Sequence, residues 1–173
     1  AHNFVLPNIK WDQETKKFLK KIGLYQNEYT TQIENHDWLA ESLNDIIIIS
    51  GILLDFSKDI WIYIMLDYIK QKNISSEVGS STMPHKVNPI NFENAEGNLE
   101  ILIGICQTVS KKLISSRLQR DLSDSTVLRN IGLIFAYFHI SVISIQKGMK
   151  KIDLNLDKIN YDIDSSWETV SYT

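Results

Sequence analysis

One stretch of the sequence combines the residue types that stabilise negative charge in an active site. It runs from Gly79 to Pro89 and reads Gly-Ser-Ser-Thr-Met-Pro-His-Lys-Val-Asn-Pro. A glycine hinge, three adjacent hydroxyl groups, the Lys86 ammonium group and the Asn88 amide supply the hydrogen bonds and positive charge that a carboxylate or an oxyanion requires. Composition alone would suit an ordinary turn between helices at least as well. The order of the residues therefore has to distinguish an active-site loop from such a turn.

A second segment has the composition of an anion-binding site. Ser125 and Thr126 begin a predicted helix, where free backbone N–H groups favour an anion, and an arginine lies on each side of the pair. Asp121 and Asp124 lie in the same segment. These two carboxylates could instead pair with the arginines in a purely structural network, and both interpretations remain open from the sequence.

Long helices are expected to position both segments. Hydrophobic residues make up 43% of the 173-residue chain, and only three prolines interrupt it. Apolar residues recur at helical spacing from Asp37 to Lys72, which predicts one helix of roughly 50 Å. Further helices are predicted from about Ile90 to Ile114 and from about Ser125 to Lys151, with a short surface helix over Trp11–Lys21. The predicted fold is all-α, with three long antiparallel helices joined by functional loops.

Composition excludes some classes of partner. The formal net charge is −3 and no long basic tract is present, so nucleic acid is not expected as a partner. The longest charge-free stretch, Asn130–Gln146, contains several polar residues and falls short of the roughly 20 mainly apolar residues that span a membrane. It is therefore predicted to be a buried helix of a soluble protein. Cys106 is the only cysteine and lies in an apolar run, which predicts a buried, inert thiol.

The order of residues in Gly79–Pro89 resembles the signature loop of the fumarase/aspartase superfamily, glycine-serine-serine-x-x-proline-x-lysine-x-asparagine, and every fixed position is present. His85 stands where fumarases usually have glycine and argininosuccinate lyases glutamine. Together with Asn94, Glu96, Gly97 and Asn98, it makes the segment similar to the bacterial-type adenylosuccinate lyase family. Residues 116–130 and 29–34 resemble the same family, so the similarity covers nearly the whole chain.

This resemblance implies a β-elimination that releases fumarate, with no metal or organic cofactor. Ser80 matches the general base, and Lys86 and Asn88 match residues that hold the carboxylate beside the forming carbanion. Glu93 matches a glutamate that orients the acid histidine, although a plain solvated helix residue is the alternative. The residues that match substrate contacts are Gln32, Ser81, Lys86, Asn94, Arg120, Ser125, Thr126, Val127, Leu128 and Arg129.

The family's acid histidine comes from an earlier segment that this chain does not contain. His36 could line the site, but capping or structural hydrogen bonding is favoured. His85 is interpreted as a residue that shapes the loop or contacts the substrate. His139 is interpreted as a core residue whose polar atoms are hydrogen-bonded. The chain lacks an initiator methionine, so we expect it to begin inside a longer protein. Alone, it is expected to be inactive.

The resemblance also implies the organisation of the whole protein. Residues 1–152 match the C-terminal part of the family's central helical bundle, and residues 153–173 the truncated start of its C-terminal domain. The expected assembly is a cytoplasmic homotetramer with a common helical core, whose active sites are shared between subunits. Its small-molecule substrates would be adenylosuccinate and SAICAR. The alternatives are another fumarate-releasing enzyme such as argininosuccinate lyase, or a catalytically silent helical oligomerisation module.

Overall fold

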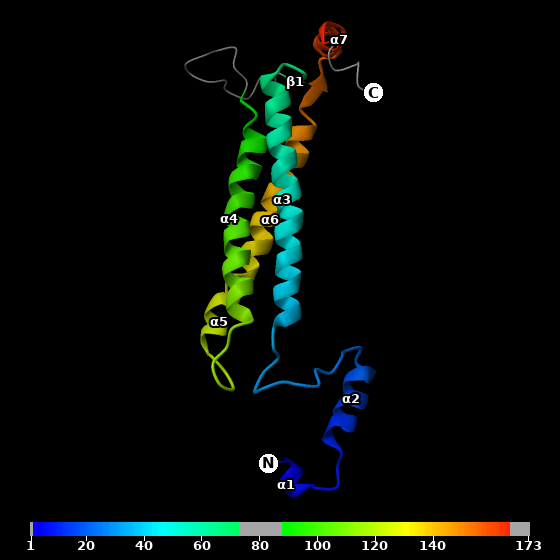
Figure 1. The fold of residues 1–173 in the computed structure, drawn as a ribbon, viewed down its shortest axis with the longest axis vertical. Helices are drawn as coiled ribbons and strands as arrows, with labels where there is room; N and C mark the ends of the chain where they lie inside the picture. The colour runs from blue at the N-terminus through cyan, green and yellow to red at the C-terminus, as the bar shows by residue number, and fades with distance from the viewer. Residues whose placement is uncertain (1, 73–87, 167–173) are drawn as a thin grey trace.

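The computed structural model describes residues 2–72 and 88–166. The long helices within residues 37–65, 90–113 and 131–149 form a bundle, and the N-terminal residues 2–36 lie beyond one end of it (Figure 1). The elements in chain order are α1 (His2–Val5), α2 (Trp11–Lys21), α3 (Asp37–Met65), β1 (Ile69–Gln71), α4 (Ile90–Leu113), α5 (Ser123–Leu128), α6 (Ile131–Met149), β2 (Ile152–Leu154) and α7 (Leu156–Ser165). The predicted all-α bundle is confirmed, and α2 has the predicted bounds.

Helix α4 lies at the centre of the packing, against α3 and α6, and successive long helices run in opposite directions (Figure 1). Its buried side chains recur every three or four residues, which gives one continuous apolar stripe along the helix. The buried residues of this stripe are Phe92, Ala95, Leu99, Leu102, Cys106, Val109, Ser110 and Leu113. Two buried hydroxyls join the helices: Ser110 donates to the Ala40 carbonyl of α3 at 3.3 Å, and Ser144 of α6 donates to the Asn91 carbonyl at 2.9 Å.

The first long helix is shorter than predicted. α3 ends at Met65, so it spans about 43 Å at 1.5 Å per residue rather than roughly 50 Å. Asp67 adopts a left-handed backbone conformation with φ of 60°, which ends the helical path. The Asn155 side chain donates to the Asp67 carbonyl at 2.8 Å, and β1 then pairs with β2 in an antiparallel two-stranded sheet. The helical periodicity of residues 66–72 gave no sign of this distant strand partner.

The third predicted helix is broken near its start. α5 begins at Ser123, and residues Arg129 and Asn130 separate it from α6. The Asn130 side chain donates to the Val127 carbonyl at 3.2 Å, a local bond of the kind that competes with regular helix formation.

Residues 123–149 are long and apolar enough to span a membrane by length and composition alone, and 22% of their most apolar window is buried within this chain. Only one side of α6 packs against α4, where the buried residues are Ile134, Ser141, Ser144, Ile145 and Gly148. The prediction of a buried helix is therefore met on one face only, and the remaining apolar surface needs another partner.

The C-terminal residues attach to the end of the bundle where α3 finishes. The Asn155 backbone N–H donates to the Tyr68 carbonyl at 2.8 Å, and the Tyr68 hydroxyl donates to Asp162 of α7 at 3.0 Å. Lys158 pairs with the same carboxylate at 2.8 Å. Helix α7 is thereby tied to the turn between α3 and β1.

Candidate functional site

The bundle separates the predicted site residues into two groups. We call the end where α3 finishes and α4 begins the loop end, and the opposite end, where α3 begins and α4 finishes, the turn end. Asn88, Glu93 and Asn94 lie at the loop end, whereas Gln32, Arg120 and residues 125–129 lie at the turn end. The twenty residues of helix from Glu93 to Leu113 separate the groups by about 30 Å.

At the loop end, the described residues hold part of the predicted catalytic set. Ser80, Ser81, His85 and Lys86 lie outside the described residues. The Asn88 carbonyl accepts the Ile90 N–H at 2.8 Å, at the start of α4.

Glu93 is exposed on α4, and its Oε1 accepts a hydrogen bond from the Trp61 indole N–H of α3 at 3.1 Å. A bond to one carboxylate oxygen restricts the orientation of the group and leaves the second oxygen open to another partner. The sequence analysis missed Trp61, because a contact between residues 32 positions apart on different helices leaves no local pattern.

Asn94 lies beside a cavity of about 510 Å³ between α4 and α6. Its Oδ1 accepts from the Asn98 side chain at 3.1 Å and from the Ser144 hydroxyl at 3.3 Å. The polar residues lining this cavity are Asn91, Asn94, His139, Ser144 and Lys147. His139 is exposed at the rim of this cavity, so its interpretation as a core residue was wrong.

At the turn end, two segments far apart in the sequence meet. The Gln32 backbone N–H donates to the Gln119 carbonyl at 3.4 Å. A cavity of about 220 Å³ lies between residues 31–36 and residues 112–124, and its lining includes Glu34, His36, Lys112, Asp121 and Asp124. The fold therefore brings the Gln32 and Arg120 segments together, as a shared binding site requires.

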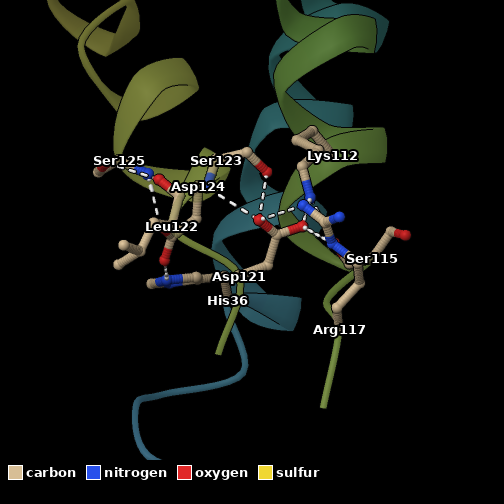
Figure 2. Close-up of polar contacts among 9 residues, drawn as sticks. All are labelled: His36, Lys112, Ser115, Arg117, Asp121, Leu122, Ser123, Asp124 and Ser125. Atoms are coloured by element: carbon tan, nitrogen blue, oxygen red, sulfur yellow. Dashed lines mark hydrogen bonds and ion pairs between the residues drawn. The ribbon is translucent and has the colours of Figure 1, made fainter. Parts of the chain in front are cut away.

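Asp121 is the centre of the polar network at this end (Figure 2). Its carboxylate, 8% exposed, pairs with Lys112 at 3.0 Å and with Arg117 at 3.2 Å, and it accepts both the backbone N–H and the hydroxyl of Ser123. These bonds, led by the Ser123 N–H and the Arg117 guanidinium, hold the pKa of Asp121 far below its ordinary value. Asp121 thus belongs to a structural network that fixes the turn leading into α5.

The two arginines predicted to contact the substrate are not part of this network. Arg120 and Arg129 are exposed and form no ion pair with any residue in the ranges 2–72 and 88–166. Asp121 instead pairs with Arg117 and Lys112, which the sequence analysis did not single out. Both guanidinium groups therefore remain available for an anion.

The expectation of free backbone N–H groups at Ser125 was wrong. Helix α5 begins two residues earlier, so the Ser123 N–H goes to Asp121 and the Ser125 N–H to the side chain of Asp124 (Figure 2). Acidic side chains in a first helical turn satisfy these donors themselves. The Ser125 hydroxyl donates to the Leu122 carbonyl at 2.8 Å, Thr126 is exposed, and the side chains of Val127 and Leu128 pack partly against the core.

The prediction for Cys106 can also be compared with the structure. Cys106 is fully buried, and burial raises the pKa of its thiol to about 11, as expected for an inert core residue. Among the described residues, no group of three or more His, Cys, Asp or Glu side chains is arranged to hold a metal ion.

Comparison with known proteins agrees with the sequence resemblance. The "Lyase" family model matches residues 7–107, and the "Adenylosuccinate lyase C-terminal" model matches residues 116–173. Over 99% of its length the chain is 49% identical to adenylosuccinate lyase of Legionella pneumophila, 46% to that of Escherichia coli and 43% to that of Haemophilus influenzae. It spans 38% of the length of each of these relatives. The chain belongs to the lyase family of the helical fumarase/aspartase fold, and the relatives to which it is similar there are adenylosuccinate lyases.

Proposed function

We propose that the protein containing this chain cleaves adenylosuccinate to AMP and fumarate, and SAICAR to AICAR and fumarate, in purine biosynthesis. One observation carries the proposal: the complete superfamily loop Gly79–Pro89 lies in a chain that is similar, along almost all its length, to adenylosuccinate lyases. Because the chain spans 38% of those relatives, the activity belongs to the whole protein and not to this chain alone.

The elimination follows from the roles that the resemblance assigns. Ser80 takes a proton from the succinyl carbon next to the carboxylate that is remote from the nitrogen-bearing carbon. The electron pair left behind spreads into that carboxylate, and Lys86 and Asn88 stabilise the resulting aci-carboxylate. The C–N bond then breaks, the double bond of fumarate forms, and the purine amine nitrogen takes a proton from the acid histidine supplied by another segment. No metal or organic cofactor takes part.

Glu93 fits a role in orienting that histidine. Trp61 holds one oxygen of its carboxylate at 3.1 Å, and within residues 2–72 and 88–166 no hydrogen bond or ion pair occupies the other oxygen, which can therefore accept an imidazole N–H. A carboxylate that is already oriented loses less freedom when it positions a catalytic imidazole.

The turn end suits the nucleotide part of the substrate. Arg120 and Arg129 are exposed cations without ion-pair partners among the described residues, and a phosphate accepts hydrogen bonds from such guanidinium groups in a bidentate manner. The same region contains Gln32 and the segment Ser125–Arg129, which includes Thr126. We propose that this segment contacts the phosphate. At the loop end, Ser81, Lys86 and Asn94 are proposed to contact the succinyl part.

We propose a homotetramer whose active sites combine the loop end of one copy with the turn end of another. A separation of about 30 Å within one bundle is too large for both groups to contact one small substrate. The large apolar side chains left exposed on α3 and α6 would be covered by the other copies; they include Ile48, Ile52, Ile62, Phe135 and Ile140. This assembly, rather than a membrane, is the proposed partner of the apolar stretch 123–149.

Two further features of the whole protein are proposed on the same basis. Residues 1–152 form part of the central bundle domain, and residues 153–173 begin the C-terminal domain. A cytoplasmic location suits a protein segment whose one cysteine is a buried free thiol.

The experiment is to measure fumarate release by the full-length protein, offered adenylosuccinate, SAICAR and argininosuccinate separately. We expect turnover of the first two only, and a loss of about 100- to 10,000-fold in kcat for Ser80→Ala, the range typical of a missing general base. Ser76→Ala, in the same stretch of sequence, is the matched control and is expected to retain activity. Turnover of argininosuccinate alone, or normal kcat in Ser80→Ala, would contradict the proposal.

A further inference from the structure

We propose that His36 is a positioning residue that holds the Gln32 segment against the segment bearing Arg120 and Ser125. The inference rests on the proposed function, because it assumes that both segments contact the nucleotide. From the sequence, His36 could line the site, with capping or structural hydrogen bonding favoured.

The backbone of His36 is fixed in an uncommon conformation. It immediately precedes α3 with φ of 59° and ψ of 12°, a left-handed conformation that most side chains avoid. The His36 backbone N–H donates to Oε2 of Glu34 at 2.7 Å, and the same oxygen lies 2.9 Å from Nδ1 of the imidazole. Glu34 therefore fixes both the main chain and the ring of His36.

The other side of the ring faces the opposite segment. Nε2 of His36 lies 3.8 Å from Oδ2 of Asp124, whose side chain is 11% exposed (Figure 2). The second oxygen of Asp124 accepts the Ser125 backbone N–H. A continuous set of contacts thus runs from the segment containing Gln32, through the imidazole, to the backbone of Ser125.

Among the residues that the structure describes, one other polar contact joins the two segments directly, the 3.4 Å hydrogen bond from the Gln32 N–H to the Gln119 carbonyl. This bond joins two backbone groups, so a side-chain substitution leaves it in place. The imidazole, whose side chain is 19% exposed, is the side-chain link, and a substitution can remove it.

Carboxylates flank the His36 ring on both sides. Glu34 comes from its own segment and Asp124 from α5, and Asp121 and Lys112 line the same cavity as an ion pair. Each ring nitrogen therefore faces a carboxylate oxygen, one from either segment, and the imidazole bridges the two.

The test uses the full-length enzyme and three substitutions. His36→Asn keeps a residue that tolerates the left-handed conformation and a short donor beside Glu34, but it cannot reach Asp124. Asp124→Asn removes the charge on the other side, and the double variant measures the coupling between them. His2→Asn, on α1, is the matched control for loss of an imidazole.

We expect His36→Asn to raise KM for adenylosuccinate about two- to fivefold, with kcat changed less than about twofold, since a partly exposed polar contact contributes modestly. The double variant should be no worse than the more affected single variant, because both substitutions break the same link.

An unchanged KM in His36→Asn, or effects of the two substitutions that simply add, would overturn the inference. A fall in melting temperature without a change in KM would also overturn it, since that result describes a purely structural residue. These outcomes are distinct from failure of the proposed function, which would appear as a wild-type enzyme that releases no fumarate from adenylosuccinate.

Discussion

Replacing Gly148 with alanine is expected to disturb the loop end of the bundle. Gly148 lies near the end of α6, and a Cβ atom added there would meet two carbon atoms of the Phe92 ring at 2.7 Å. Phe92 is 2% exposed and lies in the first turn of α4, next to Glu93. Since carbon atoms pack at about 3.5–4.0 Å, the ring or the helix has to move by about 1 Å.

Two effects of this substitution oppose each other. Overpacking a core costs about 1–3 kcal/mol, whereas alanine is favoured over glycine in a helix by about 0.8–1.0 kcal/mol. The net loss is then about 1 kcal/mol, which corresponds to a fall of about 1–2 °C in melting temperature for a protein as long as the relatives, of which this chain spans 38%. Because Glu93 follows Phe92 directly, we also expect a lower kcat.

The assay compares thermal unfolding of the full-length variants, followed by circular dichroism at one protein concentration. Gly104→Ala in α4 is the matched control, since a Cβ atom there meets no atom of the described residues within 4 Å, and it should raise the melting temperature or leave it unchanged. Adding Phe92→Leu to Gly148→Ala should recover part of the loss by making room. A Gly148→Ala protein as stable as Gly104→Ala would refute the packing argument.

Three further predictions concern single side chains. Trp61→Phe removes the indole N–H donor to Glu93 and should lower kcat about two- to fivefold, because one exposed hydrogen bond to a charged group is lost. The control is Trp38→Phe, on an exposed part of α3, which should leave kcat unchanged. The pKa of Asp121 is depressed in the folded protein, so its bonds stabilise the fold at neutral pH, and this contribution is lost as the pH falls below about 4. Asp121→Asn should therefore lower the melting temperature at pH 7. Under acid conditions the melting temperatures of the variant and the wild type should be closer together. Cys106, with its pKa raised to about 11, should remain unmodified by iodoacetamide in the folded protein at pH 8 and react fully after denaturation, and rapid native labelling would contradict its burial.

The sequence was sufficient for those parts of the fold that depend on local periodicity. The helix predicted from about Ile90 to Ile114 is α4, and the three- and four-residue spacing of Phe92, Ala95, Leu99 and Leu102 matches its buried stripe. The strand pair β1–β2 and the end of α3 depend on Asn155 reaching Asp67 across 88 positions, which no local pattern reveals. Likewise, the composition of residues 120–129 predicts an anion site, but only the structure shows that Asp121 and Asp124 bind the backbone N–H groups and leave Arg120 exposed.

The separation of the two groups of site residues could also not be predicted from the sequence. Gln32 and Arg120 are 88 positions apart yet lie at one end, because α3 and α4 run in opposite directions, whereas Glu93, which is closer to Arg120 in the sequence, lies at the other end. The roles of Ser80 and Lys86 rest on the family resemblance, since they lie outside the described residues.

Complementation between two inactive variants tests most directly whether the ends of the bundle serve different active sites. One full-length variant would carry Ser80→Ala at the loop, and the other Arg120→Ala with Arg129→Ala at the turn end. If each site takes its loop from one copy and its turn end from another, random one-to-one mixing leaves both intact at about one quarter of the sites. We therefore predict about 25% of wild-type fumarate release from co-expressed mixed oligomers, against almost none from either variant alone. Mixed oligomers without activity would contradict the assignment of the two ends to different copies.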